Sequence, residues 1–291
     1  MLIAFSNSLM SLFGFTKNKE SKERISQGSV DDISIINNTD YTIKIACVSN
    51  TGHVRKQNED NFLIESHYME KDHQSLEQPY YFEKDSHQQT VVAVFDGMGG
   101  ENAGELASFV GAYELADLGA FQKLTDDYIT RIVRELNERV FDAGVRGKYR
   151  QIGSTMSMII FKNQSAHICN LGDSPIYLFR NGQLLLQSKL HTNAEALKKM
   201  GITNRKPGLT QFLGIDKEEF LVEPTIKHTW IQKNDLYLIC SDGLTDMVPE
   251  EEIAKVLSGE YTVSEKIETL KNMALNNGGK DNVTIILAEV Q

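Results

Sequence analysis

The sequence contains few of the residues that would place it outside the ordinary globular classes. Its only 3 cysteines lie far apart in apolar runs, so they suggest neither a disulfide framework nor a paired-cysteine zinc site; they are Cys47, Cys169 and Cys240. It has only 5 prolines in 291 residues, with 41% hydrophobic and 24% charged residues, which is typical of a folded globular chain. We therefore expect a reducing, cytoplasmic setting.

Basic residues are also scarce. There are 30 of them against 40 acidic residues, which gives a formal net charge of -10. Such a chain repels the phosphate backbone of DNA or RNA unless a local basic stripe overrides the balance, and the sequence shows no such stripe. We expect no nucleic-acid partner.

The N-terminus lacks a long hydrophobic run. A membrane-spanning helix needs roughly 20 apolar residues, and residues 1–15 include serine and asparagine and precede their positive charges, unlike a secretory signal. We expect residues 1–40 to form a loose tail that takes no part in catalysis. The alternative is a short interfacial helix that touches lipid through Leu2, Phe5, Leu9, Leu12 and Phe13.

From residue 41 to residue 291 the pattern alternates strand-like runs with amphipathic helices and predicts one continuous domain. The expected strands are Ile43–Val48, Phe62–Glu65, Val91–Phe95, Met156–Phe161, His167–Leu171, Ile176–Phe179, Leu236–Cys240 and Val283–Val290. The expected helices are Glu101–Leu118, Asp126–Val145, Glu250–Leu257 with Pro249 in its first turn, and Val263–Leu275.

Strands outnumber helices, so we predict an α+β fold in which helices pack outside layered sheets. Asn181 and Gly182 separate two strand-like runs and form a strong two-residue hairpin signal. At least part of the sheet system is therefore predicted to be antiparallel.

Acidic residues stand at the ends of four strand-like runs, each beside a small or turn-forming residue. Asp96, Asp173 and Asp242 follow their strands, and Asp281 precedes its strand. Each pair alone is explained by an ordinary turn. Together they suggest carboxylates that meet at one end of a sheet, where like charges need protons or a cation to stay close.

The expected ligands indicate which metal this centre takes. Carboxylates, a Gly97 carbonyl and water are hard oxygen donors that suit Mg²⁺ or Mn²⁺ rather than zinc. The histidines show no metal-binding spacing, and we interpret His53, His167, His191 and His228 as surface or core residues.

A second charged cluster lies upstream, in residues 51–60. Arg55 can grip a phosphate through paired hydrogen bonds, while Glu59 and Asp60 join the metal site directly or through water. Taken alone, the cluster is more typical of a solvated charged loop.

In residues 41–290 the chain resembles the metal-dependent (PPM, or type 2C) serine/threonine protein phosphatases of bacterial type. The resemblance is carried, in the family's order, by motifs at residues 52–60, 94–100, 153–155, 170–174, 209–214, 240–246 and 279–284. It implies an α-β-β-α sandwich, with a central pair of antiparallel sheets flanked by helices and a two-metal site at one edge.

The resemblance also implies roles for individual residues. Asp96 would bridge two Mn²⁺ or Mg²⁺ ions, Asp242 and Asp281 would bind the second ion, and Asp173 would help to hold a third; Gly97 would supply a carbonyl, and Glu59 and Asp60 would complete the ligand shell. Arg55 would bind the substrate phosphate. The implied partners are phosphoproteins modified by a Ser/Thr kinase, and we expect a monomer.

Met98 departs from the family pattern, because some members have a histidine there that protonates the leaving oxygen. Two rival functions stay open: a catalytically silent signalling module of the same fold, and a two-metal phosphodiesterase or nuclease. A cysteine phosphatase is disfavoured, because no arginine follows Cys169 or Cys240 at the required spacing.

Overall fold

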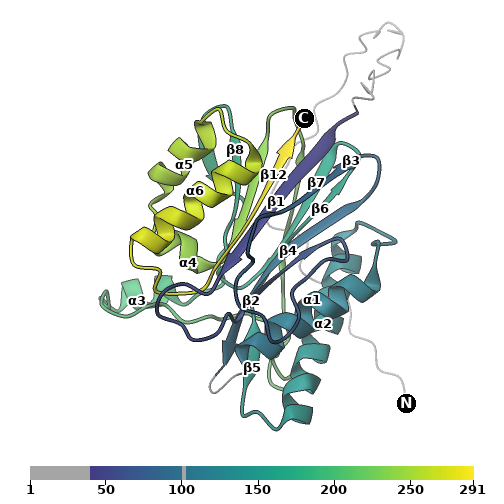
Figure 1. Cartoon of the computed structure of the whole chain (residues 1–291). Helices are drawn as coiled ribbons and strands as arrows, with labels where there is room; N and C mark the ends of the chain where they lie inside the picture. Colours follow the sequence, from purple (N-terminus) through teal and green to yellow (C-terminus); the bar gives the residue numbers. More distant parts are fainter. Residues whose placement is uncertain (1–39, 100–102) are drawn as a thin grey trace, which may run out of the picture. The chain divides into compact units, whose positions relative to one another are not determined.

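The computed structural model describes residues 40–99 and 103–291 (Figure 1). The predicted tail, apart from Asp40, and its alternative as an interfacial helix lie outside the described residues. Within those residues no helix combines the length and apolar character that crossing a bilayer requires.

Two β-sheets form the centre of the fold, and every strand pair described is antiparallel. The first sheet has the strand order β3 (Tyr80–Asp85), β1 (Thr42–Asn50), β12 (Val283–Val290), β11 (Leu236–Cys240), β8 (Ile176–Arg180) and β9 (Gln183–Leu186). The second has the order β10 (Thr225–Trp230), β7 (Ser165–Leu171), β6 (Met156–Lys162), β4 (Thr90–Gly99) and β2 (Asp60–Ile64), and the short β5 (Ile152–Ser154) pairs with the end of β4.

Helices cover the outer face of each sheet (Figure 1). α1 (Gly104–Leu118) and α2 (Asp126–Gly147) pack on the second sheet, and α5 (Glu250–Ser258) and α6 (Val263–Asn276) pack on the first. The short helices α3 (Ala194–Lys199) and α4 (Asp242–Thr245) lie in connections. The predicted α-β-β-α sandwich is confirmed.

The strand sequences show why both sheet faces are covered. Successive side chains of a strand point to opposite faces. In β1, Ile43 and Ile45 enter the core between the sheets, while Ala46 and Val48 enter the core under α5 and α6. Continuous apolar strands are therefore the expected consequence of burial on two sides.

The strongest local signals are confirmed. α2 begins after Thr125, whose hydroxyl accepts the N–H of Tyr128, and it buries the predicted stripe from Ile129 to Val140. Asn181 and Gly182 both have positive φ and close the β8–β9 hairpin, as a two-residue turn requires.

Two helix boundaries differ from the prediction. Pro249 is extended and precedes α5 as its N-cap, rather than standing in the first turn. α1 begins at Gly104, and residues 101 and 102 of the predicted helix lie outside the described part. The pattern also missed the edge strands β3 and β10, whose many exposed residues interrupt the apolar signal.

Candidate metal centre

The predicted carboxylates meet at one edge of the two sheets. Asp60 begins β2 and lies directly opposite Asp96 in the β2–β4 pairing. Asp242 follows β11 and Asp281 precedes β12, and these two strands pair in antiparallel fashion. The end of one strand therefore lies beside the start of the next.

A cavity of about 290 Å³ at this edge, here called the acidic cavity, brings the site together. Seven of the eight predicted residues line it: Arg55, Glu59, Asp96, Gly97, Asp173, Asp242 and Asp281. The eighth, Asp60, is 1% exposed and lies behind Asp96. Its lining residues come from six stretches of the sequence, each more than 30 residues from the next, so the tertiary fold and not local spacing assembles it.

The electrostatics of the acidic cavity are those of carboxylates held too close together. Burial, and then the charge of Asp60 and Asp242, raises the pKa of Asp96 well above its ordinary value. Burial raises the pKa of Asp60 to about 7, although hydrogen bonds from Ser241 and Thr284 oppose the rise. Burial and the charge of Asp242 raise the pKa of Asp173 to about 6. The site thus favours protons or cations.

Two basic side chains supply part of the missing positive charge. Arg55 donates from Nη2 to Asp281 Oδ2 at 2.7 Å, and its Nη1 lies 3.9 Å from Glu59 Oε2. Lys206 Nζ lies 2.7 Å from Asp242 Oδ2 and 2.8 Å from Asp246 Oδ2. Lys206 and Asp246 were not among the predicted site residues, because Lys206 lies in an exposed polar connection without a periodic pattern.

The donor set fits hard divalent cations. As the side chains stand, no three His, Cys, Asp or Glu residues of the described ranges surround a single point. The fit depends instead on the raised carboxylate pKa values of the cavity. Outside the lining, Glu105 has a buried Oε2 with no hydrogen-bond partner within the described residues. A charge of Glu105 also raises the pKa of Glu59, after the larger effect of burial. Oxygen ligands of this kind suit Mg²⁺ or Mn²⁺.

Buried polar side chains fix the carboxylates in place. Ser241 donates from Oγ to Asp60 Oδ2 at 2.7 Å and accepts the N–H of Thr284. Thr155 accepts the N–H of Asp96 at 3.0 Å and shares a hydrogen bond with Ser174. These contacts give a structural reason for the small polar residues in the motifs around residues 155, 174 and 241.

Gly97 is required by its neighbours. A Cβ at this position would lie 2.2 Å from the Gly104 carbonyl oxygen and 2.4 Å from that of Glu59. A Gly97 carbonyl that approaches an ion is the reason that the sequence suggests for this glycine. The structure adds a second reason, which is the packing of α1 and of the loop before β2 against the strand end.

None of the histidines singled out in the sequence lines the acidic cavity. His167 and His228 face each other across the β7–β10 pair, with 2.7 Å between their Nδ1 atoms, and His191 is buried. Cys169 and Cys240 are buried free thiols whose pKa is raised by burial, which is unfavourable for a nucleophile.

Comparison with known proteins identifies the class. The family model described as "Protein phosphatase 2C" matches residues 51–197, and the chain belongs to this family. It is 31% identical to "Serine/threonine phosphatase stp" of Listeria monocytogenes serovar 1/2a over 255 residues, which cover 82% of this chain and 92% of that protein.

Solved structures agree with this assignment. The serine/threonine phosphatase of S. agalactiae superposes with a TM-score of 0.71 at 25% identity, covering 86% of this chain and 100% of that one. The catalytic domain of the phosphatase PstP, solved in complex with 2 manganese ions, superposes with a TM-score of 0.67 at 28% identity over 86% of this chain and 99% of that one.

Proposed function

We propose that this protein removes phosphate from phosphoserine and phosphothreonine in other proteins, with two Mn²⁺ or Mg²⁺ ions in the acidic cavity. The observation that carries the proposal is the convergence of Asp96, Asp242 and Asp281 on one cavity together with Arg55. Asp96 would contact both ions, Asp242 and Asp281 the second ion, and Gly97 would offer its carbonyl. Glu59 and Asp60 complete the shell, and Asp173 would hold a third ion.

When bound, two divalent ions supply Lewis acidity that activates water as the nucleophile and offsets charge on phosphorus. The carboxylates would hold these ions, and their raised pKa values favour bound protons when no ion is present. Arg55 has a side chain that is 47% exposed, so its remaining N–H groups can bind phosphate oxygens in a paired geometry. The Met98 side chain has no acidic proton to donate, so the leaving oxygen would take its proton from water.

The same proposal covers the domain bounds, the cellular setting, the substrates and the oligomeric state of the protein. Residues 41–291 form the catalytic domain, and residues 1–40 are a tail that takes no part in the chemistry. The buried free thiols fit a reducing cytoplasm. The substrates are phosphoproteins made by a Ser/Thr kinase, and the protein acts as a monomer.

Phosphate release from a phosphothreonine peptide tests this function. With Mn²⁺ we expect release that a chelator abolishes, and a loss of at least about 100-fold in Asp242→Asn, because a lost ligand weakens the metal centre. Asp72→Asn is the matched control, since the Asp72 side chain is 90% exposed and lies outside the acidic cavity. Cleavage of a phosphodiester instead would identify a nuclease, and inactivity on both substrates would identify a silent module.

A further inference from the structure

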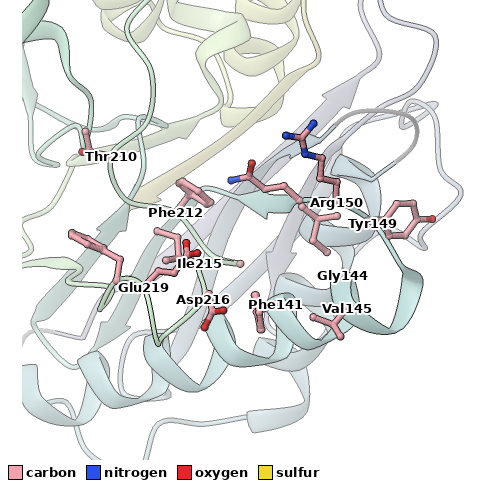
Figure 2. Close-up of a pocket in the computed structure, with 14 residues that line it drawn as sticks. Phe141, Gly144, Val145, Tyr149, Arg150, Thr210, Phe212, Ile215, Asp216 and Glu219 are labelled. Carbon is pink, nitrogen blue, oxygen red and sulfur yellow. The ribbon is translucent and has the colours of Figure 1, made fainter.

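A second cavity, here called the flank cavity, lies between the end of α2 and the loop that precedes β10 (Figure 2). Its volume is about 500 Å³. Phe141, Tyr149 and Phe212 give it half-buried aromatic walls, and Arg150 and Glu219 place charged groups on it. Figure 2 shows Arg150 entering from the connection after α2, and Phe212, Asp216 and Glu219 from the loop before β10.

The flank cavity adjoins the acidic cavity through β5. Met98 and Gly99 line the acidic cavity, and Gly99 pairs across the strands with Ile152, which lines the flank cavity. A Cβ on Gly153 would lie 2.7 Å from both Met98 Cε and Phe212 Cδ2, so side chains of the two cavities pack on the same glycine.

The second shared wall is the segment that follows Lys206. Leu209 lines the acidic cavity, and the next residue, Thr210, lines the flank cavity. Adjacent strands are about 4.8 Å apart, and an extended peptide advances about 3.3 Å per residue. A substrate chain that leaves the acidic cavity therefore reaches the flank cavity within about two to four residues.

The charged and aromatic side chains that line the flank cavity determine which substrate chains fit it. The Arg150 guanidinium is exposed, and within residues 40–99 and 103–291 it has no hydrogen bond or ion pair. Asp216 accepts the N–H of Glu218 in its own turn, and with the exposed Glu219 it leaves two carboxylates on the same cavity. Arg150 stands on the connection after α2, whereas both carboxylates stand on the loop before β10. On the Arg150 side, the complement is an apolar side chain against the aromatic walls, next to a carboxylate that pairs with Arg150.

We propose that the flank cavity binds the substrate chain beside the phosphorylated residue and favours a bulky apolar residue next to an acidic one, two to four positions from the phosphate. This inference rests on the proposed phosphatase function and names a substrate class for it. Specificity then comes from a site separate from the catalytic carboxylates.

The test compares kcat/KM for phosphothreonine peptides that carry Phe-Asp, Phe-Lys or Ala-Ala on either side, and for p-nitrophenyl phosphate, which is too small to reach the flank cavity. We expect the Phe-Asp peptide of one side to exceed Ala-Ala by about tenfold, within the range that pocket contacts give. Arg150→Glu should reverse the Asp-over-Lys preference and leave p-nitrophenyl phosphate hydrolysis unchanged. Arg146→Glu, which changes an exposed arginine of α2 outside the cavity, should keep the wild-type preference.

Equal rates for all flanks, or a preference that survives Arg150→Glu, would overturn the inference. So would an equal loss of p-nitrophenyl phosphate hydrolysis in Arg150→Glu, which would place Arg150 in the catalytic site. Absence of all phosphate release would instead refute the phosphatase function. In that case fluorescence anisotropy with labelled forms of the same peptides would still decide whether the cavity prefers the Phe-Asp flank. A dimer that Arg150→Glu dissociates in sedimentation would assign this face to a second copy and also overturn it.

Discussion

The side-chain carbonyl oxygen of Asn282 accepts the backbone N–H of Glu59 at 2.8 Å, across 223 residues of sequence. The amide nitrogen of Asn282 donates to the carbonyl oxygens of Thr51 and Gln57, both at 2.9 Å. One buried side chain thus holds the 51–60 loop, with Arg55 and Glu59, against the segment just before β12 that carries Asp281.

Asn282→Ala should therefore loosen the metal centre without removing a ligand. A buried backbone group left unpaired costs about 1–3 kcal/mol, and three half-buried groups lose their partner here, so we expect the free energy of unfolding to fall by at least about 2 kcal/mol. Urea denaturation measures this loss. Asn272→Ala, at an exposed position of α6, is the matched control and should change stability by less than about 0.5 kcal/mol. Equal effects of the two variants would contradict the role given to Asn282.

Gly97→Ala should be among the most damaging single-methyl changes in the chain. The added Cβ meets two carbonyl oxygens closer than 2.5 Å, and both belong to backbone that cannot move without displacing α1 or the loop before β2. We expect a loss of about 3 kcal/mol or more in thermal or urea unfolding. Gly208→Ala is the control, since its nearest neighbour would lie at 4.0 Å. A Gly97→Ala protein of wild-type stability would show that this contact is not required.

Lys206→Ala should bind Mn²⁺ more tightly than the wild-type protein. The Lys206 ammonium pairs with Asp242 and therefore competes with a cation for the same carboxylate. The Lys206 side chain is 58% exposed, so the gain is limited to about fivefold by the small energies of solvated ion pairs. Isothermal titration with Mn²⁺ measures it, and Lys199→Ala in α3 is the control. Unchanged or weaker binding in Lys206→Ala would contradict the competition.

His191 should make stability depend on pH. Its buried Nδ1 accepts the N–H of Gly172, and its Nε2 meets Thr225 Oγ1, so the neutral ring fits the fold. Burial, and then Lys189, lower the pKa of His191. Because the unfolded chain takes up this proton first, stability is complete above pH of about 6.5 and falls as the pH drops below it.

His191→Asn keeps an acceptor near Gly172 and does not titrate, so it isolates this effect. Urea denaturation of both proteins with chelator present, from pH 8 to pH 5, should show the wild type losing more stability than the variant as the pH falls. The carboxylates of the acidic cavity have raised pKa values, so they favour the folded state as the pH falls, which is the opposite effect. Both proteins share this contribution, and it cancels in the difference between the two curves. Parallel curves would exclude His191 as the source.

The strands and helices that could be predicted from the sequence are those whose burial requires a regular pattern of apolar residues. β1, β4 and β12 are apolar on both faces and α2 has a continuous stripe, so their patterns are strong. The edge strands β3 and β10 were not predicted, because a strand with one neighbour and an exposed face has few apolar residues in a regular pattern. Pro249 was placed one residue too far into its helix, a boundary that local propensity does not fix.

In the candidate site, too, some residues could be predicted from the sequence and others could not. Asp242 and Asp281 could be selected because each stands next to a strand end, which ties the residue type to a place in the fold. Asp96 was selected by the same pattern, but it lies within β4, which continues to Gly99 instead of ending at Phe95. Lys206, Asn282 and the flank cavity could not be predicted, since their contacts join segments that only the tertiary structure brings together.

The most direct test of the metal centre is anomalous X-ray diffraction near the manganese edge from crystals grown with Mn²⁺. We predict two peaks within the acidic cavity, both next to Asp96. One of them should also lie next to Asp242 and Asp281. Peaks confined to other parts of the molecule, with Asp96, Asp242 and Asp281 free of metal, would contradict the account.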